Sequence, residues 1–317
     1  MEKNATLYNL TQQLQGQIFV SAFRTHLDDE QRQAILERPA IMGIRRGYAE
    51  SPAWMMVQVM EFDTEPLTVD LFRRRAVYSA PKLSLGLLEL LASEGLLDRD
   101  GDGYFMTEAG KAYAEKSAQF SVIAFEGYTP VDSEKINALE TLMRRVIDAS
   151  LQVDETHHGT WCLTHSRNRA PSADAPALAK IVQYGADFNA FRDDAHMAAC
   201  AKHEVDGHTW EAFSQVRDGA ATSANDLYAN LAYRGFYTQD WQIALDSLTK
   251  RAWLEKTDEG YRVTEAGQAV SDDIERQTDA YFFAQWDVLS EQEFEQMVSL
   301  MEMVRDACQE RLQAQAQ

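Results

Sequence analysis

The chain has 317 residues, of which 45% are hydrophobic and 25% charged, which are proportions of a soluble globular protein rather than a disordered one. This length is sufficient for two ordinary domains, each with its own core. The net charge of −20 repels nucleic acid at long range, although the local charge at a contact face decides binding. With three cysteines, no secretory leader and no long apolar run, we expect a cytoplasmic protein without a membrane span.

The first half of the chain predicts a helix, a hairpin and a second helix in succession. Leucines at positions 83, 87, 90, 91 and 97 recur with helical spacing, and Gly95 suits the end of that helix. Two short apolar pieces then flank an Asp/Gly turn within residues 96–106, which is typical of a β-hairpin. Thr107 is a suitable N-cap for the next helix, and Gly110 would allow close packing of that helix.

The second half repeats this pattern. The phrase YFMTEAG at residues 104–110 returns as YRVTEAG at residues 261–267, and seven of fifteen positions are identical between residues 96–110 and 253–267. A helix over 239–252, a hairpin and an N-cap at Thr264 follow the same order. We interpret the chain as a tandem duplication with a first unit at 1–155, a linker at 156–174 and a second unit at 175–317.

Both repeats resemble the core of MarR-type regulators, in which a leucine-rich helix, a G-L/W-L-E step, a wing and a T-E-A-G run follow one another. The helices at 133–150 and 290–308 resemble that family's C-terminal dimerisation helices. The resemblance implies a mainly α-helical fold with small β-wings, in which two tandem winged helix-turn-helix units form an intramolecular pseudo-dimer. The second half is also similar, more weakly, to SalK-like tandem winged-helix proteins. Similar phrases occur in dimerisation domains of O-methyltransferases, but the chain has no glycine-rich motif for their cofactor.

The resemblance implies that basic and hydroxyl side chains of the two winged cores contact duplex DNA. These predicted DNA-binding residues are Arg73, Arg74, Arg75, Ser79, Lys82, Arg99, Arg234, Lys250 and Arg262. Each core holds five basic and seven acidic residues, so the cores are nearly neutral. Both wings have acidic tips, and Asp240 at the start of the second recognition helix has the wrong sign for a phosphate. The alternative is that the three consecutive arginines form a solvated helix face with salt bridges to nearby carboxylates.

Histidines and cysteines cluster near the middle of the chain with one spacing used twice. The predicted metal ligands are His158, Cys162 and His165, expected on a loop, and His196, Cys200 and His203, expected on a helix. Side chains at i, i+4 and i+7 share one helix face, and imidazole and thiolate suit a divalent metal such as zinc. The alternatives are an amphipathic helix with Cys200 in the core, or a histidine sensor of pH or ligand.

Aromatic side chains predict a small-molecule pocket between the winged cores and the terminal helices, with the core as the alternative. The candidates are Trp54, Trp210, Trp241, Tyr281, Phe282 and Trp286. A P-loop, a nucleophile elbow and a zinc-protease motif are all missing, so an enzyme is disfavoured. The adjacent pair Asp193 and Asp194 diverges by about 100° on a helix, and we interpret it as solvated and helix-starting.

The leading hypothesis is a ligand-responsive, DNA-binding transcriptional regulator that acts as a fused pseudo-dimer. An effector would shift the spacing of the two recognition helices. The alternative is a small-molecule or metal-binding protein that kept the winged-helix scaffold and lost DNA binding. The expected partners are duplex DNA and a small-molecule effector, and further homo-oligomerisation stays open.

Overall fold

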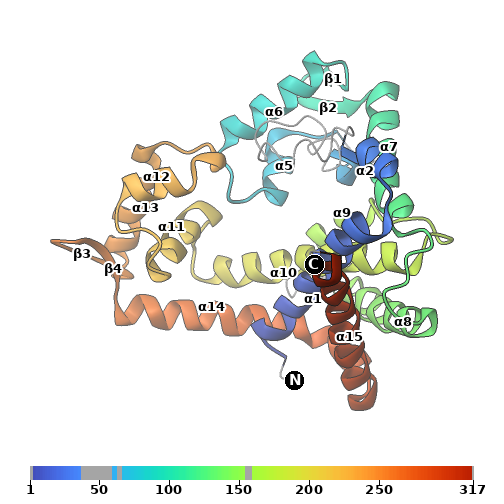
Figure 1. Ribbon diagram of the computed structural model, residues 1–317. Coiled ribbons are helices and arrows are strands. Elements are labelled where there is room, and N and C mark those ends of the chain that lie inside the picture. The colour runs from blue at the N-terminus through green and yellow to red at the C-terminus, as the bar shows by residue number, and fades with distance from the viewer. Residues whose placement is uncertain (1–2, 37–58, 63–65, 154–158, 316–317) are drawn as a thin grey trace.

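The computed structural model describes residues 3–36, 59–62, 66–153 and 159–315. The protein is mainly helical and carries two small antiparallel hairpins, which confirms the predicted fold class (Figure 1). None of the described helices is long and apolar enough to cross a lipid bilayer.

The first half begins with a helical layer and continues into the first winged region. Its elements are α1 (Ala5–Ser21), the π-helical turn η1 (Ala22–His26), α2 (Asp29–Leu36), η2 (Met60–Phe62), α5 (Val69–Arg75), α6 (Pro81–Ser93), β1 (Leu97–Asp100), β2 (Gly103–Met106), α7 (Glu108–Phe125) and α8 (Ser133–Ser150).

The second half starts with a short helix and the longest helix of the described chain. Its elements are α9 (Trp161–Arg167), α10 (Ala177–Lys202), α11 (Gly207–Arg217), α12 (Ala224–Asn230), η3 (Ala232–Arg234), α13 (Thr238–Lys250), β3 (Leu254–Thr257), β4 (Gly260–Val263), α14 (Glu265–Phe283), η4 (Ala284–Val288) and α15 (Glu291–Gln315).

The two hairpins and the helices around them have matching bounds. α13 begins and ends 157 residues after α6, and β3 and β4 follow β1 and β2 at the same distance. The strand registers also correspond, because Leu97 pairs with Met106 and Leu254 pairs with Val263. A third chain segment borders each hairpin: Leu67 pairs with Tyr104, and the Tyr261 N–H donates to the Thr222 carbonyl at 2.9 Å. The hairpins predicted from the Asp/Gly turns are therefore confirmed.

The predicted N-caps are also confirmed, and each ties a helix to the preceding turn. The Thr107 hydroxyl accepts from the Gly110 N–H at 2.9 Å, and Thr264 accepts from the Gly267 N–H at 3.0 Å. Gly267 is required by close packing, because a Cβ there would lie 2.2 Å from the Trp253 carbonyl oxygen. Helices α7 and α14 thus begin at fixed positions beside their wings.

The apolar side chains of the described residues form three cores. A central core takes residues from both halves of the chain, because α1, α8, α10, α14 and α15 all contribute to it. Leu88, Leu97 and Tyr104 belong to the core under the first wing, and Trp241 and Leu254 to the core under the second. Helices α8 and α15 pack together as predicted. Figure 1 shows α10 running from this centre toward the second wing, with α14 alongside it.

Candidate nucleic-acid interface

The second half contains two helices joined by a tight turn, in the order expected of a helix-turn-helix. Helix α12 ends at Asn230, η3 follows, and Gly235 adopts a left-handed conformation with φ of +78°. The turn leads into α13, and the carboxylate of Asp240 in its first turn accepts from the N–H of Tyr237, the residue before the helix, at 2.8 Å. Asp240 therefore caps the recognition helix.

The face that α13 turns outward is mixed in character. Trp241, Leu245 and Leu248 are buried, whereas Ile243 is 61% exposed and Lys250 is exposed at the last residue of the helix. Asp246 lies between these two on the same face. A recognition face of this kind offers one cation, one carboxylate and an apolar side chain to a partner.

The first half presents the corresponding helix α6 after the shorter helix α5. Leu88 and Leu91 are fully buried, and Lys82 and Glu89 are exposed. Glu89 stands 157 residues before Asp246, so each recognition helix carries a carboxylate at the same position of its exposed face. These carboxylates repel phosphates and would contact DNA favourably only through a donor group on a base.

Comparison with known proteins supports a helix-turn-helix in the second half of the chain. A family model described as a helix-turn-helix family matches residues 172–315. Residues 172–315 contain a helix-turn-helix domain. No curated protein and no solved structure matched the chain.

Outside this helix-turn-helix domain, the predicted arginine cluster divides between the surface and the interior. Arg73 is half-buried, and Arg74 is exposed with its guanidinium 4.2 Å from the centre of the Trp161 ring. Arg75 is 13% exposed and forms ion pairs with Glu61 and Asp193 at 3.1 and 2.6 Å. For Arg75 the structure matches the salt-bridge alternative, although the side chain is not solvated.

The other predicted DNA-binding residues also differ in availability. Ser79 is half-buried in the turn before α6. Arg234 pairs with Glu211 at 2.8 Å and is 27% exposed, so it is held by the protein itself. Arg99 and Arg262, on the wings, are 51% and 68% exposed and pair with Glu89 and Glu255 at 3.8 and 2.8 Å. Among the nine, the exposed cations are therefore Arg74 and Lys82, each of which rests on an aromatic ring, together with Lys250 and the two on the wings.

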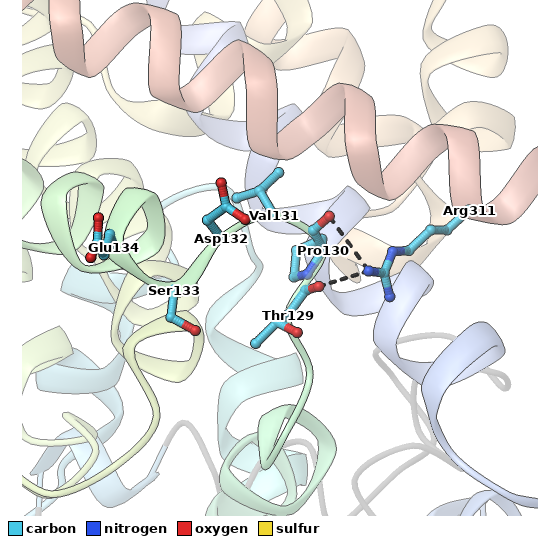
Figure 2. Close-up of a pocket in the computed structure, with 7 residues that line it drawn as sticks. All are labelled: Thr129, Pro130, Val131, Asp132, Ser133, Glu134 and Arg311. Carbon is cyan, nitrogen blue, oxygen red and sulfur yellow. Dashed lines mark hydrogen bonds between the residues drawn. The ribbon is translucent and has the colours of Figure 1, made fainter.

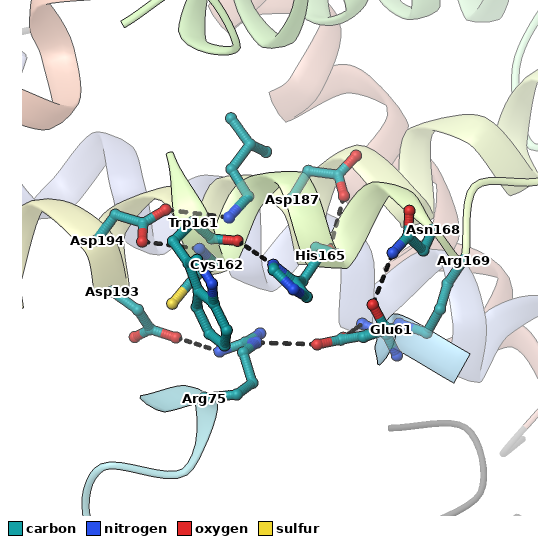
Figure 3. Close-up of polar contacts among 12 residues, drawn as sticks. Glu61, Arg75, Trp161, Cys162, His165, Asn168, Arg169, Asp187, Asp193 and Asp194 are labelled. Carbon is teal, nitrogen blue, oxygen red and sulfur yellow. Dashed lines mark hydrogen bonds and ion pairs between the residues drawn. The ribbon is translucent and has the colours of Figure 1, made fainter. Parts of the chain in front are cut away.

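A buried ionic network connects the first winged region with the start of the second half (Figure 3). Glu61 is fully buried in η2 and binds Arg75 together with Arg169, the latter at 2.7 Å. The Asn168 side chain donates to the Glu61 carbonyl at 2.6 Å. Burial alone would lower the pKa of Arg75, but the carboxylates of Glu61 and Asp193 raise it above its ordinary value. The network therefore keeps its cation and joins four segments distant in sequence.

Asp194 supports α9 from the neighbouring helix α10. Its carboxylate accepts the N–H groups of Cys162 and Leu163 at 2.8 and 3.0 Å, as an N-cap would (Figure 3). Burial raises the pKa of Asp194 to about 6 despite these hydrogen bonds. Two predictions are wrong here. Both aspartates lie within α10 rather than at a solvated helix start, with Asp194 buried and Asp193 half-buried in an ion pair with Arg75. Cys162 lies on a helix rather than a loop.

The predicted metal ligands do not come together in the part of the chain that the structure describes. One pair is close, because the Cys200 Sγ lies 3.5 Å from the His196 Nε2. The His203 Nε2 instead pairs with the Asp273 carboxylate at 2.9 Å, and the His165 Nδ1 contacts the Trp161 carbonyl oxygen at 2.7 Å. His158 lies outside the described residues. Within them, no group of three or more histidine, cysteine or acidic side chains could hold a metal ion.

The thiols of Cys162 and Cys200 are buried, which disfavours the thiolate that metal binding would need. Burial raises the pKa of Cys200 to about 12, and it raises the pKa of Cys162 beyond the ordinary range of a thiol. Burial also lowers the pKa of His196 to about 4, so its imidazole is neutral at physiological pH. Cys200 therefore follows the core alternative that its spacing left open.

The aromatic residues predicted to line a pocket lie in two different cores. Trp210 and Trp241 are buried under the second wing, whereas Phe282 and Trp286 are buried in the central core, with Tyr281 half-buried beside it. Trp54 lies outside the described residues. These side chains fit the alternative of core packing. Figure 2 shows a surface hollow elsewhere, lined by residues 129–134 and Arg311, which holds none of them.

Sequence reasoning missed Glu61, Asn168 and Arg169. The one signal for Glu61 is its position in the apolar segment Val59–Met60–Glu61–Phe62, because a carboxylate within an apolar run must be paired if it is buried. Its partners Arg75 and Arg169 stand too far along the chain for spacing to indicate the contact.

Proposed function

We propose that the protein is a ligand-responsive, DNA-binding transcriptional regulator of MarR-like type, in which two fused winged units act as a pseudo-dimer. The helix-turn-helix domain at 172–315 carries this proposal. The matching bounds and registers of the two hairpin regions support a duplicated origin, with units near 1–155 and 175–317. The central core built from both halves would take the place of a dimer interface.

The proposed DNA contacts are the cations that are not engaged in the interior. Lys82 and Lys250 lie on the recognition helices, and Arg99 and Arg262 lie on the wings. Arg99 pairs with Glu89 on α6, and Arg262 pairs with Glu255 on β3; all four side chains are exposed. Surface ion pairs contribute little to stability, so phosphates can replace these carboxylates. An effector would act by changing the spacing of the recognition helices, which is a shift between two populated arrangements.

The test is the binding of fluorescently labelled duplex DNA to the full chain at low and at moderate salt. We expect binding that weakens as salt rises, because each phosphate contact releases counterions. Lys250→Glu should weaken binding, whereas Lys135→Glu, at an exposed position on α8, changes the net charge equally and should not. An absence of duplex binding even at low salt would refute the proposal.

The second candidate is a small-molecule or metal-binding protein that has kept this scaffold without binding DNA. The carboxylates of Glu89 and Asp246 at matching positions of the two recognition helices favour it, as do the acidic wing tips. Under this alternative, a ligand retained through purification, identified by mass spectrometry or elemental analysis, would accompany the lack of DNA binding.

A further inference from the structure

The turns that precede the two recognition helices are in direct contact. The Ala80 N–H donates to the Arg234 carbonyl at 2.8 Å, which joins the turn before α6 to the turn before α13. The Lys82 ammonium lies 2.9 Å from the centre of the Tyr237 ring. We call the contact between these two turns the turn contact. It comprises the contacts of Ala80 and Lys82 with Arg234 and Tyr237, and the close approaches at Gly207 and Gly235.

Two glycines of the second half allow this close approach. A Cβ at Gly207 would lie 2.8 Å from the Val77 carbonyl oxygen, and a Cβ at Gly235 would lie 2.9 Å from the Leu83 Cβ. Real Cβ atoms almost never approach other atoms this closely, so a larger residue at either position would push the turns apart. The turns thus meet across surfaces that are fitted to each other.

Tyr78 extends the turn contact into the core of the second half. Its ring packs against the core under the second wing, and the Arg234 guanidinium lies 5.2 Å from the ring centre. Burial raises the pKa of the Tyr78 hydroxyl above its ordinary range, and the negative charge of the Asp193 carboxylate raises it further. A side chain of the first half is therefore seated in the second.

This arrangement brings the N-terminal ends of the two recognition helices, which would contact the bases, closer together than successive major grooves. Paired recognition helices sit about 34 Å apart on DNA, one helical turn. Here α6 begins one residue after Ala80, and α13 begins four residues after Arg234. An extended chain spans at most about 3.6 Å per residue, and the hydrogen bond itself adds about 5 Å between Cα atoms, so the two helix starts lie within roughly 25 Å of each other. In addition, the Lys82 ammonium contacts the Tyr237 ring, so a cation of one recognition helix is paired with the residue that precedes the other.

We infer that the turn contact is an autoinhibitory latch, and that the two-groove DNA-binding arrangement forms when it opens. This inference rests on the proposed function. In the closed arrangement the latch holds the recognition helices at a spacing that DNA does not offer. Because the apparent affinity falls with the fraction of competent molecules, a protein open about one tenth of the time binds about tenfold more weakly than its open form.

A reversible disulfide across the latch tests the inference. A Cβ at Gly235 would lie 3.5 Å from the Ala80 Cβ, which is within the range of about 3.5–4.5 Å that a disulfide needs. In the double variant Ala80→Cys, Gly235→Cys, we expect the oxidised protein to bind duplex DNA at least about tenfold more weakly than the same protein after reduction. A side chain at Gly235 also presses on Leu83 and strains the left-handed backbone there, so the single variant Gly235→Cys is measured beside the double variant. Neither single variant, Ala80→Cys or Gly235→Cys, should change its affinity between oxidised and reduced conditions, which also controls for the buried native cysteines.

A wedge variant tests the opposite direction. Gly207→Leu should force the turns apart and tighten duplex binding by about tenfold relative to the unmodified chain. Gly16→Leu is the matched control, because a Cβ at Gly16 meets nothing within 4 Å. Equal affinities of the oxidised and reduced double variant would overturn the latch and leave the proposed function standing. Failure of every form, the wedge included, to bind duplex DNA at low salt would overturn the proposed function and the latch with it.

Discussion

Removing the Arg75 guanidinium should destabilise the protein far more than removing an arginine from a wing. Arg75 is 13% exposed and pairs with the fully buried Glu61 and with Asp193. Breaking a buried ion pair costs about 3–5 kcal/mol, because the remaining charge stays buried. Glu61 keeps Arg169 at 2.7 Å, and Asp193 is 35% exposed, so both carboxylates retain part of their stabilisation. We therefore expect Arg75→Met to lower the free energy of unfolding by about 3 kcal/mol, the lower end of that range.

The assay is urea unfolding followed by far-UV circular dichroism, with Arg262→Met as the matched control. Arg262 pairs with Glu255 at 2.8 Å, but it is 68% exposed. Surface pairs contribute about 0–1 kcal/mol, so the control should unfold close to the unmodified chain. The slope of the free energy against urea should be the same for both variants, since each exposes the same surface on unfolding.

Similar unfolding midpoints for the two variants would show that Arg75 is not held in a buried network. A second measurement separates the pair from its surroundings. In the double variant Glu61→Gln, Arg75→Met, the loss should be smaller than the sum of the two single losses by at least about 1 kcal/mol, because contacting residues are not additive. The same result bears on DNA binding, since a triple substitution of residues 73–75 would weaken binding merely by destabilising the fold.

Two further predictions concern a glycine and a histidine. Gly267→Ala should lower the free energy of unfolding by about 1–3 kcal/mol, because its Cβ would lie 2.2 Å from the Trp253 carbonyl oxygen. Gly16→Ala, on an open helix surface, should be neutral or stabilising. Thermal unfolding of the two variants makes the comparison. Burial lowers the pKa of His196 to about 4, so the folded state binds this proton less readily than the unfolded state. The free energy of unfolding should therefore fall by up to about 3 kcal/mol as the pH drops from about 6.5 toward 4. His196→Gln should remove this part of the fall, measured by urea unfolding at pH 7 and 4.5. If the variant keeps the same pH dependence, His196 is not the group responsible.

The parts of the fold that sequence predicted well depend on local signals. Both hairpins follow from Asp/Gly turns between short apolar pieces, and the caps at Thr107 and Thr264 follow from the T-E-A-G phrase. Each of these signals acts within a few residues, where turn geometry and N-capping are decided. The helix predicted over 239–252 is observed at Thr238–Lys250, an error confined to its ends.

The parts that sequence could not predict depend on partners that are distant along the chain. Three consecutive arginines look alike in sequence, yet only the fold decides that Arg75 meets Asp193, which stands 118 residues later. The spacing of His196, Cys200 and His203 correctly indicated a helix, but it could not indicate that Asp273 of another helix binds the last of them. The sequence thus indicated which side chains could form ion pairs. The partner of each one is decided by how α9, α10 and α14 pack.

The packing of α1 against α15 sets an order for the assembly of the chain during synthesis. Helix α1 contributes to the central core beside α15, and the Gln315 side chain donates to the Arg24 carbonyl at 2.7 Å. Helix α1 therefore completes its packing only after α15 has emerged from the ribosome. Until then its leucine face stays open to water, so a nascent chain stalled before α15 should need chaperone protection that a chain containing α15 does not.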